Sequence, residues 1–167
     1  GPFFGAAPRK TDALLHDVVL AASALAERRT GALIVFERKE GLRNFIENGI
    51  ALDARLSFDL LVSIFTPDAP LHDGAIIIQA ERIAAASCFL PLTANPELSK
   101  AHGSRHRAAL GISEETDALA LVVSEESGEI SLAVGGELER NLDKSQLAIR
   151  LHYHLLTDAD SSLRRGR

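Results

Sequence analysis

Residues 75–90 read Ala-Ile-Ile-Ile-Gln-Ala-Glu-Arg-Ile-Ala-Ala-Ala-Ser-Cys-Phe-Leu. Two apolar runs, each of strand length, flank the polar break at residues 80–82. Short apolar runs that are rich in β-branched residues and separated by a polar break predict a β-hairpin. The hairpin lies near the middle of the chain, so the rest of the fold has to be built around it.

The segments before this hairpin alternate between helical and strand patterns. Thr11 or Asp12 is able to cap a helix. Apolar residues then recur at helical spacing, which predicts that this helix runs to about Arg28. Gly31–Phe36 predicts a buried strand. A short helix is expected within Gly41–Glu47, and Ser57 is a suitable cap for a helix over Phe58–Phe65.

The same alternation continues after the hairpin. Ser104 is expected to cap a helix that runs to about Ile112, and one helical turn is expected within residues 91–103. Leu119–Val123 and Ile130–Val134 predict a second hairpin, and Asp143 a helix through Leu156. Residues 1–10 are expected to be flexible, 11–156 to form one domain and 157–167 to be a disordered tail. The pattern predicts a single α/β domain with a central mixed β-sheet and helices on both faces.

Composition limits the function. The net charge of the 167 residues is −5, which argues against a nucleic acid polymer as the main partner. Cys88 is the one cysteine, so no internal disulfide forms, and a cytoplasmic setting is expected. No stretch reaches the ~18 apolar residues of a membrane span. Gly1-Pro2 has the composition of a protease scar, which suggests a soluble fragment of a longer protein.

The segment Leu71-His72-Asp73-Gly74-Ala75 stands directly before the first strand of the central hairpin. A carboxylate at such a junction is well placed to hold a cation, and Gly74 allows a ligand to approach the backbone. His72 and Asp73 offer ligands suited to Mn²⁺ or Mg²⁺. The alternative for this segment is an ordinary Asp-Gly turn.

A basic segment, Gly103-Ser104-Arg105-His106-Arg107, occurs in this acidic protein at an expected helix start. Free backbone N–H groups and forked guanidinium donors both suit a polyphosphate. The alternative is a solvated basic helix start that pairs with acidic residues such as Glu97 or Glu114.

Ser124-Glu125-Glu126-Ser127-Gly128 follows a predicted strand, and a carboxylate here is a further candidate ligand of the same metal. The alternative is a polar hairpin turn. The sequence contains no Walker-type phosphate loop, no Cys-x-x-Cys pair and no Gly-x-Ser-x-Gly motif.

Taken together, Asp73-Gly74-Ala75 and Arg105-His106-Arg107, about thirty residues apart, resemble the diadenylate cyclase family, and most closely its membrane-tethered class. The likeness extends from about residue 13 to residue 155. Two departures are Ser104 where threonine is common and Phe89 where tyrosine is common. The resemblance implies an enzyme that condenses two ATP into cyclic di-AMP and two pyrophosphates.

The resemblance also implies roles for the site residues. Each of two protomers that face each other in a homodimer or higher homo-oligomer would bind one ATP. Asp73 would bind the divalent metal, Mn²⁺ or Mg²⁺ with Co²⁺ as a further candidate, or would help to deprotonate the ribose 3′-hydroxyl. His72 and Glu126 would complete the metal ligands. The implied ATP-binding residues are Phe89, Leu90 and Pro91 beside adenine, Ser104, Arg105 and Arg107 at the phosphates, and also Gly103, Ser124 and Glu126. Gly74, Ala75 and His106 belong to the catalytic motifs, and His106 is expected to pack under the phosphate loop.

Partners and location follow from the resemblance alone. The family implies a membrane-bound regulator, phosphoglucosamine mutase as a partner, and a parent protein anchored at the cytoplasmic face of a bacterial membrane. Two other functions stay open at this point. One is an ATP-binding regulatory module of the same fold without turnover, and the other is a metal-dependent phosphohydrolase suggested by His72 and Asp73.

Overall fold

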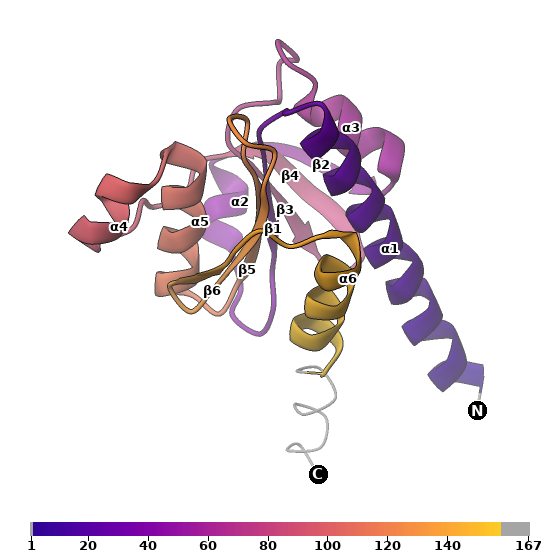
Figure 1. Cartoon of the computed structure of the whole chain (residues 1–167). Coiled ribbons are helices and arrows are strands. Elements are labelled where there is room, and N and C mark those ends of the chain that lie inside the picture. The colour runs from indigo at the N-terminus through magenta and orange to yellow at the C-terminus, as the bar shows by residue number, and fades with distance from the viewer. Residues whose placement is uncertain (1, 158–167) are drawn as a thin grey trace.

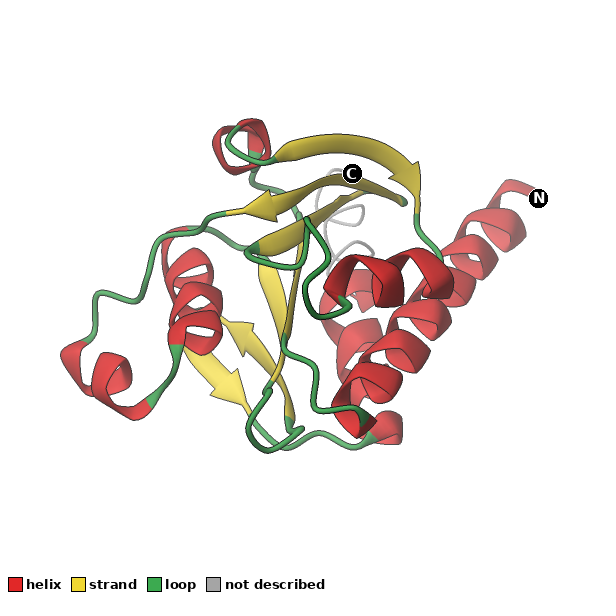
Figure 2. Cartoon of the chain, turned by 90° about the horizontal axis from the view of Figure 1, so that it is seen from above, coloured by secondary structure: helices red, strands yellow, loops and turns green. Residues whose placement is uncertain are grey.

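A computed structural model describes the backbone of residues 2–157 and the side chains of residues 11–156. The described chain forms one seven-stranded mixed sheet in the order β2-β4-β3-β1-β5-β6-β7, with helices on both faces (Figures 1 and 2). This confirms the predicted fold class. The strands are β1 (Ala32–Phe36), β2 (Ile50–Arg55), β3 (Ala75–Gln79), β4 (Arg82–Cys88), β5 (Leu119–Val123), β6 (Ile130–Val134) and β7 (Glu137–Glu139).

Two hydrophobic clusters show how the sheet is covered. Alternate residues of β1 enter different clusters: Ile34 packs on one side and Leu33 and Val35 on the other. Both sides of the central strand are therefore buried, which explains its unbroken apolar sequence. The first cluster lies under α1 (Pro2–Glu27), α3 (Phe58–Phe65) and α6 (Lys144–His152); the second lies under α2 (Arg43–Glu47) and α5 (Ser104–Glu115).

Two of the predicted helix starts, at Ser57 and Asp143, are confirmed. Ser57 accepts a hydrogen bond from the Leu60 N–H, as a capping serine does. Asp143 and Gln146 form a reciprocal capping box at the start of α6. A single short helix, α4 (Pro96–Ala101), lies between the central hairpin and α5.

Three boundaries differ from the sequence prediction. Helix α1 begins at Pro2, so residues 2–10 are helical; Pro2 stands at the first helical position, where proline is well tolerated. Gly103 rather than Ser104 is the cap residue of α5, because the Ser104 backbone is already helical. Helix α6 ends at His152 and continues as a π-helical turn, Tyr153–Thr157. The predicted tail lies outside the described residues from 158 onward.

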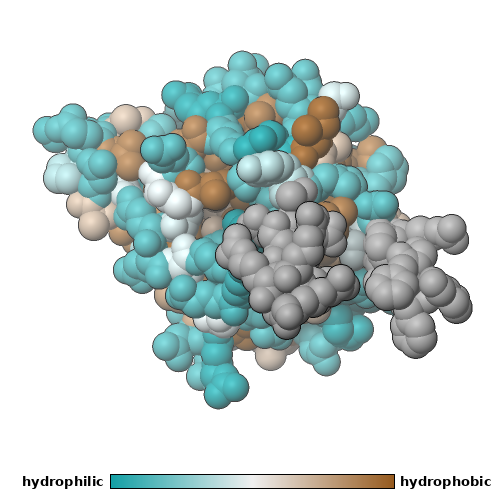
Figure 3. All heavy atoms as spheres, turned by 90° about the horizontal axis from the view of Figure 1, so that it is seen from below, coloured by the Kyte–Doolittle hydropathy of each residue, from teal (hydrophilic) through white to brown (hydrophobic). Residues whose placement is uncertain are grey.

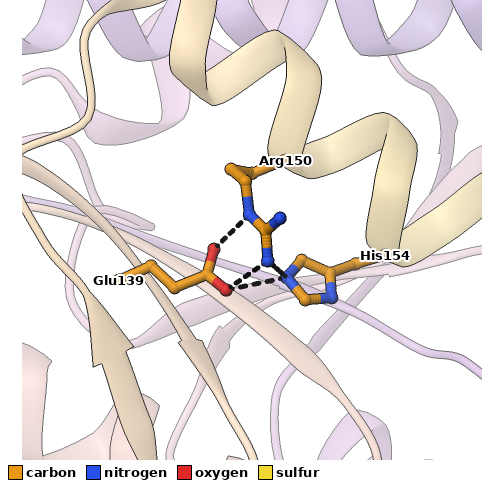
Figure 4. A network of polar contacts seen from close by, with 3 residues as sticks. All are labelled: Glu139, Arg150 and His154. Carbon is orange, nitrogen blue, oxygen red and sulfur yellow. Dashed lines mark hydrogen bonds and ion pairs between the residues drawn. The ribbon is translucent and has the colours of Figure 1, made fainter.

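The end of α6 is fastened to β7 by a polar network (Figure 4). The Glu139 carboxylate accepts from Arg150 Nε at 3.0 Å and lies 3.1 Å from His154 Nε2. Burial lowers the pKa of His154, and the hydrogen bond that the His154 ring makes to Glu139 offsets this lowering only in part. The Arg150 guanidinium also stacks over the Tyr153 ring at 4.6 Å.

No helix among the described residues is long and apolar enough to cross a membrane. The face seen in Figure 3 is mostly hydrophilic, with hydrophobic residues in small separate groups.

Candidate functional site

The sheet register brings the predicted motifs to one end of the sheet. β1 and β3 are parallel, with Ile34 opposite Ile76, so Gly31 and Gly74 precede neighbouring strands at the same end. β4 and β5 run antiparallel to β3 and β1, so they finish where those strands begin. Residues far apart in the sequence therefore converge at this end.

A small cavity of about 140 Å³ joins two of the motifs. Its lining includes Asp73 and Gly74 from the loop before β3, and Ser104 and Arg105 from the start of α5. The other lining residues are Leu33, Cys88, Phe89, Leu90, Leu92 and Ala108. A carboxylate and a guanidinium thus face one cavity beside an apolar wall.

A larger cavity of about 300 Å³ shares Ser104 and Arg105 with the small one. Gly103 and His106 line it from the helix side, and Ser124 and Glu126 line it from the turn between β5 and β6. The remaining lining residues are Ala101, His102, Val123, Glu125, Ser127, Glu129 and Arg140. Because the cavities share two residues, they form adjoining compartments around the start of α5.

Arg105 is held in place by close packing rather than by a full set of polar partners. A Cβ atom at Gly31 would lie 2.5 Å from Arg105 Nη1, so the guanidinium rests directly on the backbone at the start of β1. Arg105 Nη1 lies 3.5 Å from the Glu125 carboxylate, while the buried Nε has no partner. A buried donor without a partner is unfavourable, and a bound anion would satisfy it.

The start of α5 provides a second set of donors. Its cap residue, Gly103, has no side chain that could bind the first N–H groups of the helix. The Gly103 carbonyl accepts a hydrogen bond from the Arg107 N–H at 3.0 Å. The N–H groups of the first helical residues have no partner within the helix, and the helix dipole favours negative charge beside them.

Gly74 brings the Asp73 loop against the end of β4. Its φ of +87° is a conformation that glycine adopts easily, and a Cβ atom there would lie 3.0 Å from the Cys88 carbonyl oxygen. The Asp73 carboxylate is exposed and accepts a hydrogen bond from the Gly74 N–H at 3.1 Å. Cys88 is fully buried, and burial raises the pKa of its thiol to about 11.

The loop after β4 is fixed from two sides. The Asn48 side-chain amide donates to the Phe89 carbonyl and accepts from the Phe89 N–H, both at 3.2 Å. Glu114 binds the Thr93 hydroxyl and the Ala94 N–H. The Phe89 side chain nevertheless stays 61% exposed, so its ring is available to a ligand or to a second protein surface.

Several predicted site residues lie apart from these two cavities. Arg107 is in the lining of neither, because residues two positions apart point to different sides of a helix. Its Nε is also buried without a partner. Ala75 is buried in the sheet, and Pro91 packs its carbonyl against Gly111.

The three predicted metal ligands do not form a preformed site within one chain. No group of three or more His, Cys, Asp or Glu side chains suited to a metal occurs among the residues that the structure describes. The His72 ring bonds the Ala69 carbonyl through Nδ1 at 2.7 Å, whereas Asp73 and Glu126 line different compartments. The donor set of one chain therefore suits a cation that takes further oxygen ligands from phosphates and water.

Sequence reasoning missed three contributors to this end of the molecule. Gly31 acts through its lack of a side chain and Asn48 through its side-chain amide, and both lie far from both motifs in the sequence. Arg140 follows β7, a strand that was not predicted. The one sequence signal that bears on Arg140 is indirect: the basic residues clustered at 103–107 in an acidic chain indicate an anion site, which further basic residues would favour.

Comparison with known proteins gives consistent results. Residues 19–138 match the family model described as the DisA bacterial checkpoint controller nucleotide-binding domain, DAC. The cyclic di-AMP synthase CdaA of Bacillus subtilis is 50% identical over 133 residues, which cover 80% of this chain and 49% of that protein. The chain spans about half the length of the curated relatives it matches.

Two solved structures have the same fold. A double mutant of DacA from Staphylococcus aureus superposes with a TM-score of 0.85 at 47% identity, over 87% of this chain and 97% of that one. A hypothetical membrane spanning protein from Bacillus cereus gives a TM-score of 0.72 at 47% identity, over 75% of this chain and 61% of that one.

Proposed function

Since the chain belongs to the DAC family of nucleotide-binding domains, we propose that it is a diadenylate cyclase, which condenses two ATP into cyclic di-AMP and two pyrophosphates. The observation that carries this proposal is the cavity that Asp73 and Arg105 line together. One group suits a cation and the other a phosphate, and both lie within the reach of one nucleotide.

The phosphates are assigned to the start of α5. Ser104 and Arg105 line both compartments, so the triphosphate would extend from the small cavity into the large one. Their donors include the free N–H groups of the helix start and the unpartnered Arg105 Nε. Arg107, Gly103 and Ser124 remain proposed phosphate-binding residues. Holding the leaving pyrophosphate in this way would favour the transition state, in which its charge grows.

The apolar wall of the small cavity suits adenine. Phe89 and Leu90 line it, and the Asn48 clamp fixes the backbone on which Phe89 stands. An aromatic ring that is mostly exposed beside a cavity offers a stacking surface.

In the reaction, the ribose 3′-oxygen of one ATP forms a bond to the α-phosphorus of the other, and the bond to the pyrophosphate oxygen breaks. The 3′-hydroxyl gives up its proton, and Asp73 is the group proposed to accept it or to hold the cation. A bound Mn²⁺, Mg²⁺ or Co²⁺ would neutralise charge on the α-phosphate and lower the pKa of the attacking hydroxyl. His72 and Glu126 are proposed to complete its ligands when two protomers and their nucleotides meet.

Two such attacks require two sites that face each other, so the proposal includes a homodimer. Two apolar residues in the lining of the small cavity are available for this contact: Phe89 is 61% exposed and Leu92 is 50% exposed. A membrane-anchored parent, a membrane-bound regulator and phosphoglucosamine mutase are further expectations from the resemblance. Similarity to the hypothetical membrane spanning protein from Bacillus cereus supports the first of them.

The test is incubation of the purified chain with ATP and a series of divalent metals, followed by mass spectrometry for cyclic di-AMP and an assay for pyrophosphate. Formation of both in a 1:2 ratio, with less activity per protomer on dilution, supports the proposal. ATP binding without product would favour the silent regulatory module, and release of inorganic phosphate would favour a hydrolase.

A further inference from the structure

The larger cavity carries more basic side chains than the predicted phosphate motif explains. Besides Arg105 and His106, its lining includes His102 and Arg140. His102 is the residue that follows α4, and Arg140 follows the last residue of β7. These two residues come from different parts of the fold and line the same cavity, and neither belongs to the motifs described above.

The basic groups oppose one another electrostatically. The rings of His102 and His106 stack with their centroids 5.7 Å apart. Burial and then the neighbouring positive charges of His102 and Arg140 lower the pKa of His106. Burial and then Arg140 also lower the pKa of His102. His102, His106 and Arg140 line the same cavity, and each disfavours positive charge on its neighbours. An anion bound in this cavity would reduce the repulsion between them.

The two guanidinium groups that line this cavity each form an ion pair with a carboxylate from the turn between β5 and β6. Arg105 lies 3.5 Å from Glu125, and Arg140 Nη2 lies 3.2 Å from Glu129. The Arg140 side chain is 61% exposed, so this ion pair contributes little to stability and is easily exchanged. Glu129 and Glu125 therefore stand where phosphate oxygens would otherwise bind.

We infer that Arg140 is a further phosphate-binding residue, which binds the terminal phosphates of ATP and the departing pyrophosphate, and that Glu129 competes for it as a resident anion. The inference rests on the proposed function, because it assigns these phosphates to the large compartment. It also explains why the turn between β5 and β6 is acidic beside a phosphate site. Pyrophosphate has to displace Glu129 when it binds, and Glu129 takes its place again when it leaves.

The probe is inorganic pyrophosphate, measured both by calorimetry and as an inhibitor of the wild-type reaction. Arg140→Gln should weaken pyrophosphate binding about tenfold, the size expected for losing one charge-assisted hydrogen bond at a partly exposed site. Arg140→Lys should give a smaller loss, because it keeps the charge without the fork. Arg82→Gln is the matched control: Arg82 is also an exposed arginine paired with a carboxylate, Asp53, but it lines a different cavity.

Glu129→Gln distinguishes a role of Arg140 in binding phosphate from a purely structural role through its ion pair with Glu129. If Arg140 binds phosphate, freeing it from Glu129 should tighten pyrophosphate binding several-fold, the opposite sign to Arg140→Gln. If Arg140 only braces the hairpin through Glu129, the two variants should weaken binding alike, which would overturn the inference. Unchanged pyrophosphate binding in Arg140→Gln would also overturn it. Thermal unfolding of each variant confirms that the fold is intact.

The two proposals fail differently. A wild-type chain that makes no cyclic di-AMP with any metal refutes the proposed function, while calorimetry with pyrophosphate still tests Arg140. An active wild type whose Arg140→Gln variant keeps the same pyrophosphate inhibition refutes the role of Arg140 alone.

Discussion

The two ends of the central sheet both carry a cavity, and the larger one is not the candidate site. At the end opposite the motifs, a cavity of about 550 Å³ is lined mainly by apolar side chains of α1, β1, β3 and their neighbours, among them Leu14, Leu15, Val18, Phe36, Leu56 and Ile78. At the motif end the compartments are about 300 and 140 Å³. The chemistry of the lining, rather than the volume, distinguishes them.

The difference lies in polar groups that the fold itself leaves unsatisfied. The motif end contains the helix start of α5 and the buried, unpartnered Arg105 Nε. At the opposite end, Glu37 accepts from the Leu42 N–H and Gln79 Nε2, and Arg82 pairs with Asp53. A fold that satisfies its polar groups at one end and leaves donors free at the other has its ligand-binding capacity at the second.

Asp73→Asn is the substitution expected to separate the two ends most clearly. It should reduce cyclic di-AMP formation by about 10³-fold, because it removes the negative charge for the cation and the proton acceptor while keeping the shape. ATP affinity should change only a few-fold. Asp68→Asn, in the exposed loop just upstream, is the control and should have no effect. An Asp73→Asn enzyme with near-normal turnover would contradict the role of this carboxylate.

Gly31→Ala should have the next largest effect. The added methyl group would meet the Arg105 guanidinium, which would move because the end of a flexible side chain gives way more easily than backbone. We expect activity to fall roughly 30-fold, as for a misplaced catalytic contact, with little change in Tm. Gly41→Ala is the control, since nothing lies within 4 Å of the added atom. Equal activities of the two variants would show that the position of Arg105 does not matter.

Leu56→Ala probes the apolar end. Leu56 is 3% exposed and lines the large apolar cavity, so truncation should lower the free energy of unfolding by roughly 2–5 kcal/mol. The rate of the folded enzyme should stay within about twofold of wild type, because additive effects are expected between distant sites. Denaturant unfolding and an assay well below Tm measure the two quantities. A large loss of turnover in folded protein would indicate that the two ends are coupled.

The pH dependence of stability is the smallest expected effect. Because burial lowers the pKa of His154, the unfolded chain binds this proton more readily, and stability falls as pH drops through the ordinary histidine pKa. The pKa of Glu139 is lowered chiefly by the hydrogen bond that it accepts from Arg150. The contribution of Glu139 to stability is therefore lost only at more acidic pH, below the ordinary glutamate pKa. His154→Gln should make the decline of Tm between about pH 7 and 5.5 shallower than in wild type. An unchanged slope would show that His154 does not contribute.

The sequence predicted elements well where local pattern and burial agree. The central hairpin, the strand β1 and the capped helices α3 and α6 each have a continuous apolar run or a capping residue. Strand β2 (Ile50–Arg55) was missed because it lies at an edge of the sheet, largely exposed, with a register shift near Asp53, whose φ is positive. Strand β7 has only three residues, too few for a period to show.

The site was predictable in type but not in arrangement. Asp73 and Arg105 were identified from their neighbours in the sequence, and the structure brings them to one cavity. The separation of Arg107 from Arg105, the dispersal of His72 and Glu126, and the approach of Gly31 and Arg140 depend on sheet register and helix rotation. Such contacts between distant segments leave no periodic signal in a single sequence.

The buried thiol of Cys88 has a practical consequence. With its pKa raised to about 11 and no solvent exposure, this one cysteine is almost never a thiolate at neutral pH and should not react with maleimides. The chain therefore behaves as a cysteine-free background for site-directed labelling. A cysteine introduced at an exposed position in the last turn of α5, such as Glu115, would accept a spin label alone and would report the separation of the two protomers in the proposed homodimer.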